Sequence, residues 1–220
     1  MSTGILFDLD GVLIDSHDQH EQAWFALASE RDLPLTKQQF KESFGMRNET
    51  CIPDVFGWTQ EATEIAELGD RKEELYRQAV RSGGLVPLPG VMDLIADLLA
   101  NDVPFSLGSS TSRLNIELCL EAIGLTESFG PHLTGAEDVS RGKPNPEVFL
   151  TAAKKISHDP EACIVIEDAH VGVEAALAGG MKAVAVTTTH PADSFRDSGA
   201  SLIVASLEEL SAERLRGLLS

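Results

Sequence analysis

The first apolar run of the chain ends in two aspartates. In GILFDLDGVLID, residues 4–15, the apolar residues at 5–7 are too few for a helix, and Gly11 follows soon after, which is typical of a short buried strand. Asp8 and Asp10 therefore come directly after this strand. Two carboxylates so close together repel each other unless a cation or a shared proton lies between them. Their spacing therefore requires a chemical reason.

Other polar side chains occupy equivalent points later in the chain. They are Ser109 after the apolar run at 104–108, Glu167 and Asp168 after the run at 163–166, and Lys143 just before a predicted helix. In an open parallel sheet, ligands bind outside the carboxyl ends of the strands. We therefore expect four acids, one hydroxyl and one ammonium at the same edge of one sheet. Each acid alone could be a solvated strand end, but together the acids would only repel one another.

This set of side chains suits a phosphoryl group held by Mg²⁺. Hard carboxylate oxygens are the ligands of that ion, which bridges one or two carboxylates to phosphate. An aspartate can act as a nucleophile and form an aspartyl phosphate, and a second acid can protonate the leaving alkoxide and then activate water. Lys143 and the hydroxyl of Ser109 would neutralise and hold the equatorial phosphoryl oxygens.

The elements that must position these residues alternate along the chain. Short apolar runs predict strands at 5–7, 104–110, 163–168, 183–186 and 201–204. Helical periods predict helices over 91–99, over 116–123, from Pro146 with Asn145 as its cap, and from Ser206 with Glu209 at capping-box spacing. This alternation predicts an α/β fold, a Rossmann-like parallel sheet covered on both faces.

The region from 16 to 84 breaks the alternation. It has helical periods at about 17–30, 37–43, 60–67 and 70–81 and no convincing strand, and Ser16 and Gln19 have the spacing of a capping box. Glycines and prolines at 83–89 mark the return to the sheet. We therefore predict a catalytic core formed by 1–15 and 85–220, with an inserted helical cap domain at 16–84.

Composition limits the class of partner. The net charge of −18 comes from 17 basic and 35 acidic residues, which disfavours nucleic acid and anionic membrane surfaces. Three widely spaced cysteines are expected to be reduced, and no apolar run has the roughly 18 residues of a membrane helix. We expect a cytoplasmic protein, a monomer, whose partner is a small phosphorylated metabolite.

Four motifs, in order, resemble those of haloacid dehalogenase-like phosphohydrolases. DLDGVLID resembles the first motif, FSLGSS the second, KPNPEVF the third and VIEDAHVGVEAALAGGM the fourth. The resemblance implies the following roles: Asp8 as nucleophile and metal ligand, Asp10 as general acid/base with a backbone carbonyl on the metal, Ser109, Ser110 and Lys143 at the phosphate, and Glu167 and Asp168 at Mg²⁺. It also implies the fold of that family, with the helical insert as a mobile cap.

The insert resembles that of β-phosphoglucomutases and their hexose-phosphate phosphatase relatives. In DSHDQHEQAW, this implies proton transfer by His20 and a sugar pocket lined by Trp24, although both could also be core residues of the insert. Arg47 and Lys72 are candidates for a distal phosphate on cap closure. The core loop SSTSR lacks the Lys-Asn pair usual in the mutases, where Arg113 is a possible substitute.

The sequence therefore favours a Mg²⁺-dependent phosphatase acting on small phosphorylated metabolites, sugar phosphates among them, through an aspartyl phosphate. A β-phosphoglucomutase-like transfer is the alternative, and a catalytically silent binding protein of the same fold is disfavoured because every catalytic position is filled. The chain has no Walker A loop, no GxGxxG after a strand and no GxSxG, which argues against nucleotide-binding and esterase functions.

Overall fold

A computed structural model describes residues 3–43 and 46–219. The chain divides into two compact units, the first formed by Met1–Asp15 with Val86–Ser220 and the second by Ser16–Leu85. The first contains all the strands that the structure describes, and the second is helical.

The first unit is built on a six-stranded sheet. Its strands are β1 (Gly4–Phe7), β2 (Phe105–Gly108), β3 (Leu133–Thr134), β4 (Cys163–Glu167), β5 (Lys182–Val186) and β6 (Leu202–Val204). They run parallel in the order β3-β2-β1-β4-β5-β6, with Phe7 beside Leu107 on one side and Ile166 on the other. The strand order reverses at β1, since β2 pairs with one of its edges and β4 with the other. This reversal is where open parallel sheets bind their ligands.

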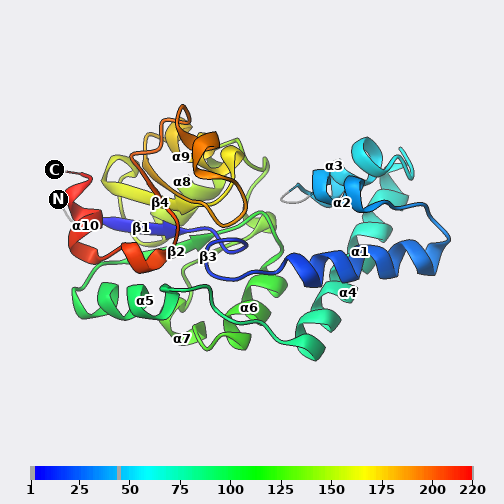
Figure 1. Ribbon diagram of the computed structural model, residues 1–220, viewed down its shortest axis with the longest axis horizontal. Helices are drawn as coiled ribbons and strands as arrows, with labels where there is room; N and C mark the ends of the chain where they lie inside the picture. The colour runs from blue at the N-terminus through cyan, green and yellow to red at the C-terminus, as the bar shows by residue number, and fades with distance from the viewer. Residues whose placement is uncertain (1–2, 44–45, 220) are drawn as a thin grey trace. The chain divides into compact units, whose positions relative to one another are not determined.

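Helices cover both faces of the sheet. They are α5 (Val91–Ala100), α6 (Arg113–Ala122), α7 (Thr126–Phe129), α8 (Glu147–Lys155), α9 (His170–Ala178) and α10 (Ala212–Gly217). Short 3₁₀ turns occur at Ala136–Asp138, Pro160–Ala162, Ala192–Phe195 and Leu207–Glu209. Helices α8 and α9 lie on one face, and α5, α6 and α7 lie on the other (Figure 1). Because both faces are covered, β1 and β4 are entirely buried and consist mainly of apolar residues.

Aromatic packing fixes β1 within this core. The ring of Phe7 makes edge-to-face contacts with Phe105 and Phe129, at centroid separations of 6.1 and 5.9 Å. Phe105 and Phe129 also contact each other, at 5.0 Å. Burying each ring contributes about 1.5–3 kcal/mol, and the edge-to-face geometry adds to this. The strand that presents Asp8 is therefore held firmly at its carboxyl end.

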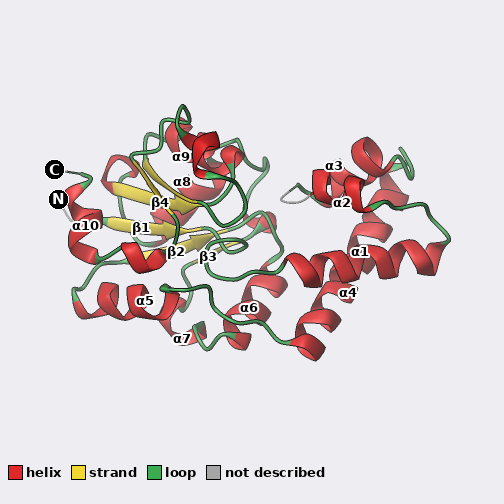
Figure 2. Cartoon of the chain, viewed as in Figure 1, coloured by secondary structure: helices red, strands yellow, loops and turns green. Residues whose placement is uncertain are grey.

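The second unit contains α1 (His17–Arg31), α2 (Lys37–Ser43), α3 (Asn48–Thr50), a π-helical segment (Cys51–Phe56) and α4 (Ala62–Gly83). Figure 2 shows that the unit consists of helices and loops. Helices α1 and α4 pack against each other, and their buried faces include Trp24 and Tyr76.

The predicted α/β fold with a parallel sheet and a helical region is confirmed. Three local predictions are wrong. Strand β3 was not anticipated, because two residues are too few to produce a periodic pattern. Helix α4 is continuous across Gly69, where a break was expected, because packing outweighs the cost of about 1 kcal/mol for a helical glycine. The last helix begins after Ser211, not at Ser206, which caps only a 3₁₀ turn.

The expected capping box at the start of α1 is also absent. Among the described residues, the side chain of Ser16 makes no capping bond to α1, and Gln19 donates to the carbonyl oxygen of Gly84 instead, at 3.0 Å. None of the helices in the described ranges is long and apolar enough to cross a membrane.

Candidate active site

The carboxylate of Asp8 lies directly beyond β1 and is buried. Its backbone N–H donates to the carbonyl oxygen of Ile166 at 3.0 Å, which continues the pairing of β1 with β4 past the end of the strand. Lys143 donates from Nζ to Oδ1 of Asp8 at 2.6 Å. This contact brings together two of the predicted site residues from distant parts of the chain.

Glu167 and Asp168 lie at the end of β4, next to Asp8. Oε1 of Glu167 accepts a second hydrogen bond from Lys143, also at 2.6 Å, and Oε2 accepts from the backbone N–H of Ala169 at 2.8 Å. Oδ2 of Asp168 accepts a hydrogen bond from Thr189 Oγ1. The two acids are thus oriented by different partners.

These three acids can hold a divalent cation. A carboxylate oxygen from each of Asp8, Glu167 and Asp168 lies within 4.8 Å of the others, and all three residues are buried. The single ammonium of Lys143 leaves two of their negative charges uncompensated. An all-oxygen, carboxylate-rich set is the chemistry that Mg²⁺ prefers, so the residues fit this ion. Within the described residues, the carboxylate of Asp10 is not part of the group.

Burial and mutual repulsion alter the acidity of this group. Burial, followed by the charges of Glu167 and Asp10, raises the pKa of Asp8 to about 7, although Lys143 acts in the opposite direction. Burial, followed by the charges of Glu167 and Asp8, raises the pKa of Asp168 well above its usual range. Burial lowers the pKa of Lys143, but the charges of Asp8 and Glu167 outweigh burial and raise it, so this side chain stays an ammonium. Without a further cation, the acids therefore compete for protons.

Lys143 lies in the loop between β3 and α8 and is almost fully buried, with 7% of its side chain exposed. Its Nζ lies 4.8 Å from the ring centroid of Phe149 on α8, within the range of a cation–π contact. An ammonium in these surroundings is stabilised by its two carboxylate partners and by the aromatic face.

The hydroxyl residues follow β2, as expected. Ser109 is buried, its backbone N–H donates to the carbonyl oxygen of Thr134 at 3.0 Å, and its Oγ accepts from the N–H of Thr111 at 3.2 Å. Ser110 and Asp10 are partly exposed. The ends of β1, β2 and β4 are neighbours in the sheet, so Asp8, Ser109 and Glu167 share one edge.

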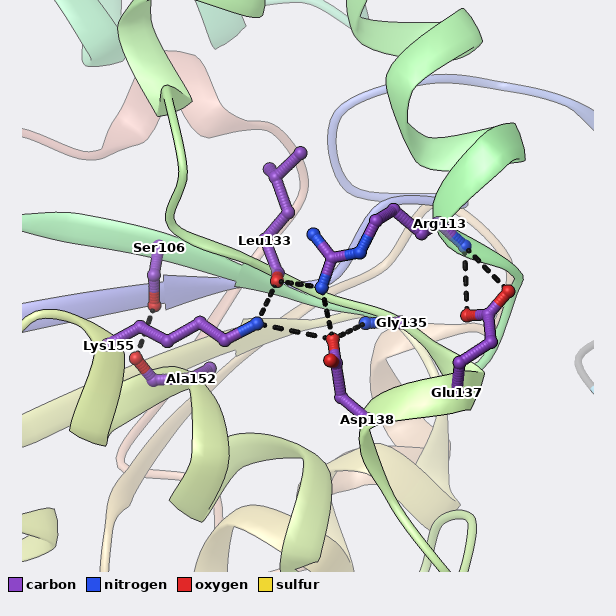
Figure 3. Close-up of polar contacts among 8 residues, drawn as sticks. All are labelled: Ser106, Arg113, Leu133, Gly135, Glu137, Asp138, Ala152 and Lys155. Carbon is purple, nitrogen blue, oxygen red and sulfur yellow. Dashed lines mark hydrogen bonds and ion pairs between the residues drawn. The ribbon is translucent and has the colours of Figure 1, made fainter.

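The guanidinium of Arg113 binds groups near the end of β3. Its Nη2 donates to Oδ2 of Asp138 at 2.6 Å and to the carbonyl oxygen of Leu133 at 3.1 Å (Figure 3). Its backbone N–H donates to the carboxylate of Glu137, at 3.0 Å to the nearer oxygen. Lys155 donates to the same two acceptors as the guanidinium. The guanidinium is therefore committed to a network at the end of β3.

The cap candidates form a cluster of their own within the helical unit. Nζ of Lys72 lies 2.9 Å from Oε1 of Glu73 and 3.0 Å from Nδ1 of His20, and 5.4 Å from the ring centroids of both Trp24 and Tyr76. Because an ammonium only donates, a hydrogen bond between these two groups requires Nδ1 of His20 to be the acceptor. His20 also stacks on Tyr76, with centroids 4.1 Å apart.

Trp24 is 4% exposed and makes edge-to-face contacts with Phe56 and Trp58, as a core residue of the helical unit would. Arg47 precedes α3 and is partly buried. The start of the FGMRNE segment that contains it, residues 44 and 45, lies outside the described residues.

Sequence reasoning missed three polar partners of the predicted residues, two at the sheet edge and one within the helical unit. Thr188 and Thr189 follow β5 and donate to the carbonyl oxygen of Gly11 and to Asp168, and the strand-end rule that identified the acids could have identified them. Glu73 is the partly buried counterion of the buried Lys72, but a glutamate within a charged helical segment gives no such signal in sequence.

Known proteins with similar sequences support this geometry. A family model described as haloacid dehalogenase-like hydrolase matches residues 3–180. A chloroplastic 5-amino-6-(5-phospho-D-ribitylamino)uracil phosphatase of Arabidopsis thaliana is 35% identical over 98% of this chain, which spans 57% of that protein's length. Hexitol phosphatase A of Escherichia coli is 32% identical, covering 96% of this chain and 94% of that protein.

Two further comparisons cover nearly whole proteins. Beta-phosphoglucomutase of Bacillus subtilis is 30% identical, covering 96% of this chain and 92% of that protein. A crystal structure of a HAD hydrolase, family IA, variant 3, from Entamoeba histolytica superimposes with a TM-score of 0.90 at 25% identity, over 100% of this chain and 99% of that one. The matching family model and the sheet edge that gathers Asp8, Lys143, Glu167 and Asp168 lead to the same conclusion: the chain belongs to the haloacid dehalogenase-like hydrolases.

Proposed function

We propose that the chain is a Mg²⁺-dependent phosphatase of small phosphorylated metabolites, sugar phosphates among them. The observation that carries the proposal is the buried group at the end of β1 and β4, in which Lys143 bridges Asp8 and Glu167 beside Asp168. Two of the relatives named above are phosphatases of small phosphorylated compounds, which supports the same class of substrate.

Asp8 is the proposed nucleophile. A carboxylate oxygen of Asp8 would attack the phosphorus, and the bond from phosphorus to the ester oxygen would break, leaving an aspartyl phosphate. Asp10 would give its proton to the departing alkoxide and would then take a proton from the water that hydrolyses the intermediate. Asp10 follows Asp8 by two residues, and its charge contributes to the raised pKa of Asp8.

Lys143 and Ser109 would bind the phosphoryl oxygens. The ammonium already compensates the charge on Asp8, and the hydroxyl lies at the neighbouring strand end. Both would act most strongly when charge spreads over the equatorial oxygens during transfer. Asp8, Glu167 and Asp168 would hold Mg²⁺, which supplies charge neutralisation at the phosphoryl group when bound.

The position of Arg113 favours the phosphatase over the mutase. A mutase must hold a bisphosphate while it reorients, which requires a cation for the distal phosphate. Arg113 is the cation nearest Ser109 in sequence, and its guanidinium is committed to Asp138 and Leu133. A phosphatase releases its product at once and therefore needs no cation to hold a second phosphate. The roles of the helical unit as a cap, and of His20, Trp24, Arg47 and Lys72 in it, remain predictions.

A product assay tests the proposal. Inorganic phosphate should appear from several sugar monophosphates in the presence of Mg²⁺, and without any bisphosphate activator. The decisive substrate is β-glucose 1-phosphate with a trace of the 1,6-bisphosphate. Rapid formation of glucose 6-phosphate with almost no free phosphate would establish the mutase instead. No turnover of any ester, including an aryl phosphate, would favour the binding protein.

A further inference from the structure

Both ends of helix α8 contact the loop that carries Lys143 or the turn that precedes it. Residues 139–146 connect the 3₁₀ turn Ala136–Asp138 with α8. Glu147 begins α8 and contacts the loop, whereas Lys155 ends the same helix and contacts Asp138. Phe149, between them, lies beneath the ammonium of Lys143. The helix thus contacts the turn before the loop, the loop residues just before Lys143, and Lys143 itself.

At the end nearer Lys143, the carboxylate of Glu147 collects three donors. Oε1 accepts from the backbone N–H of Ser140 at 3.0 Å, and Oε2 accepts from Ser140 Oγ at 2.8 Å and from the N–H of Arg141 at 3.0 Å. These residues lie two and three positions before Lys143. Because all three partners donate, only a group with two acceptor oxygens satisfies them together.

At the other end, Asp138 holds the start of the loop independently. Its Oδ2 accepts from Gly135 N–H at 3.0 Å, from Arg113 at 2.6 Å and from Lys155 at 3.2 Å (Figure 3). These bonds do not involve Glu147. Loss of the Glu147 carboxylate should therefore release the segment next to Lys143 while the turn before it stays in place.

We propose that Glu147 is a positioning residue for Lys143: its carboxylate fixes residues 140–141 and thereby places the ammonium between Asp8 and Glu167. The relevance of this role to catalysis rests on the proposed phosphatase function, whereas the placement of Lys143 itself does not. A displacement of the order of 1 Å in a catalytic group can reduce the rate about 100-fold. A residue outside the reacting centre can therefore control activity through the loop.

The variant Glu147→Gln is the sharpest test. It keeps the size of the side chain but replaces one acceptor oxygen with a donating NH₂ group that faces other donors. Glu213→Gln is the matched control, because Glu213 is an exposed glutamate in the first turn of α10. Both substitutions remove one negative charge from a helix N-terminus, and only the first affects the Lys143 loop.

The first readout is independent of activity. Reductive methylation of the full-length protein, followed by mass spectrometry, gives the rate at Lys143 relative to exposed Lys154. We expect at least a several-fold increase in Glu147→Gln and none in Glu213→Gln. The buried thiols of Cys119 and Cys163 report on unfolding of the core, and they should stay protected from a thiol reagent. Unchanged labelling of Lys143 in Glu147→Gln would overturn the proposal.

The second readout is kinetic. With Mg²⁺ and an aryl phosphate, kcat/KM of Glu147→Gln should fall on the order of 10–100-fold, with weaker inhibition by inorganic phosphate. Glu147→Asp, which retains two acceptor oxygens, should recover part of the loss. If the cysteines of Glu147→Gln react, that variant has unfolded, and the Ser140→Ala variant is used instead. Ser140→Ala removes one of the three donors and should raise the labelling rate of Lys143 by a smaller factor. An unchanged labelling rate of Lys143 in Ser140→Ala would refute the positioning role of Glu147. Absence of turnover in the wild-type protein would refute the phosphatase function and leave the labelling result valid.

Discussion

Nζ of Lys143 lies 2.6 Å from Oδ1 of Asp8, although 135 residues separate them in the chain. The contact places the positive charge of Lys143 beside the carboxylate that is proposed to attack phosphorus. It also explains how an acid can be buried at the end of β1, since the ammonium and a bound cation together balance the charges of the group.

Replacing Asp8 with asparagine should abolish turnover and leave the fold intact. The amide has nearly the same shape as the carboxylate but is a far weaker nucleophile, and losing a nucleophile typically costs at least about 10⁴-fold in kcat. Turnover of an aryl phosphate by Asp8→Asn, measured beside its circular dichroism spectrum, checks this. A folded variant that retains wild-type turnover would remove Asp8 from the mechanism.

Mg²⁺ should stabilise the folded protein through the three acids at the ends of β1 and β4. A ligand present at about 100 times its Kd stabilises by about 2.7 kcal/mol, which raises Tm by roughly 5–10 °C in a chain of this size. Asp168→Asn should lose most of this shift, because one ligand of the group is gone. Thermal denaturation with and without Mg²⁺ measures it, and equal shifts in both proteins would contradict the site.

Without metal, the stability of the core should decrease as pH rises from about 4 to about 7. Burial and neighbouring acids raise the pKa of Asp8 from 3.8 to about 7, so the folded state holds a proton in this range that the unfolded state has lost. Stability linked to that proton is complete below the unfolded pKa and disappears as pH passes the folded one. In EDTA, the free energy of unfolding of the wild type should fall with pH more steeply than that of Asp8→Asn. Parallel curves would argue against the raised pKa.

The sequence was sufficient to predict the α/β fold and the sheet edge. Each strand before a site residue is an apolar run that ends abruptly, and parallel strands bring their carboxyl ends together by topology. The same rule singles out Asp8, Ser109, Glu167 and Asp168, whereas Lys143 was predicted from its place just before a helix and from its motif. Thr189 could have been found in this way, since it follows the apolar run of β5.

The sequence did not predict which side chains pair with the candidate residues. The sequence offered Arg113 as a substitute for the Lys-Asn pair of the mutases, yet its guanidinium is bound by Asp138, 25 residues later in the chain. Likewise, Lys72 was a candidate for a distal phosphate, but its side chain is buried and its ammonium lies over the ring of Trp24 on α1. Such pairings depend on how helices pack, and residue spacing does not encode them.

Within the helical unit, Glu73→Gln should destabilise the protein by about 3–5 kcal/mol because it leaves the ammonium of Lys72 buried without its counterion. Burial favours the protonated form of Glu73, but Lys72, His20 and Asn48 outweigh it and lower the pKa to about 2. The contribution of Glu73 is thus present above its ordinary pKa of 4.5 and is lost as pH falls towards 2.

Glu74→Gln is the matched control for this change. Glu74 is the next residue in α4, and its ion pair with Arg71 is exposed, so its loss should cost at most about 1 kcal/mol. Chemical denaturation of both variants at neutral pH gives the comparison. Equal losses would show that Glu73 is not a buried counterion.

The glycine at position 172 should matter to the site more than to the fold. A Cβ there would lie 1.8 Å from Oε1 of Glu167, so Gly172→Ala must push this carboxylate away from Lys143 and from the N–H of Ala169. The carboxylate is the end of a flexible side chain, and alanine gains up to about 1 kcal/mol over glycine within a helix, so α9 should still form. We expect at least a tenfold loss of turnover and a smaller Mg²⁺-induced rise in Tm, while the metal-free Tm changes by only a few degrees.

Gly217→Ala in α10, where the added methyl group would meet no atom within 4 Å, should leave turnover and the metal response unchanged. A Gly172→Ala protein with the same metal response and turnover as this control would show that Glu167 does not need its observed position.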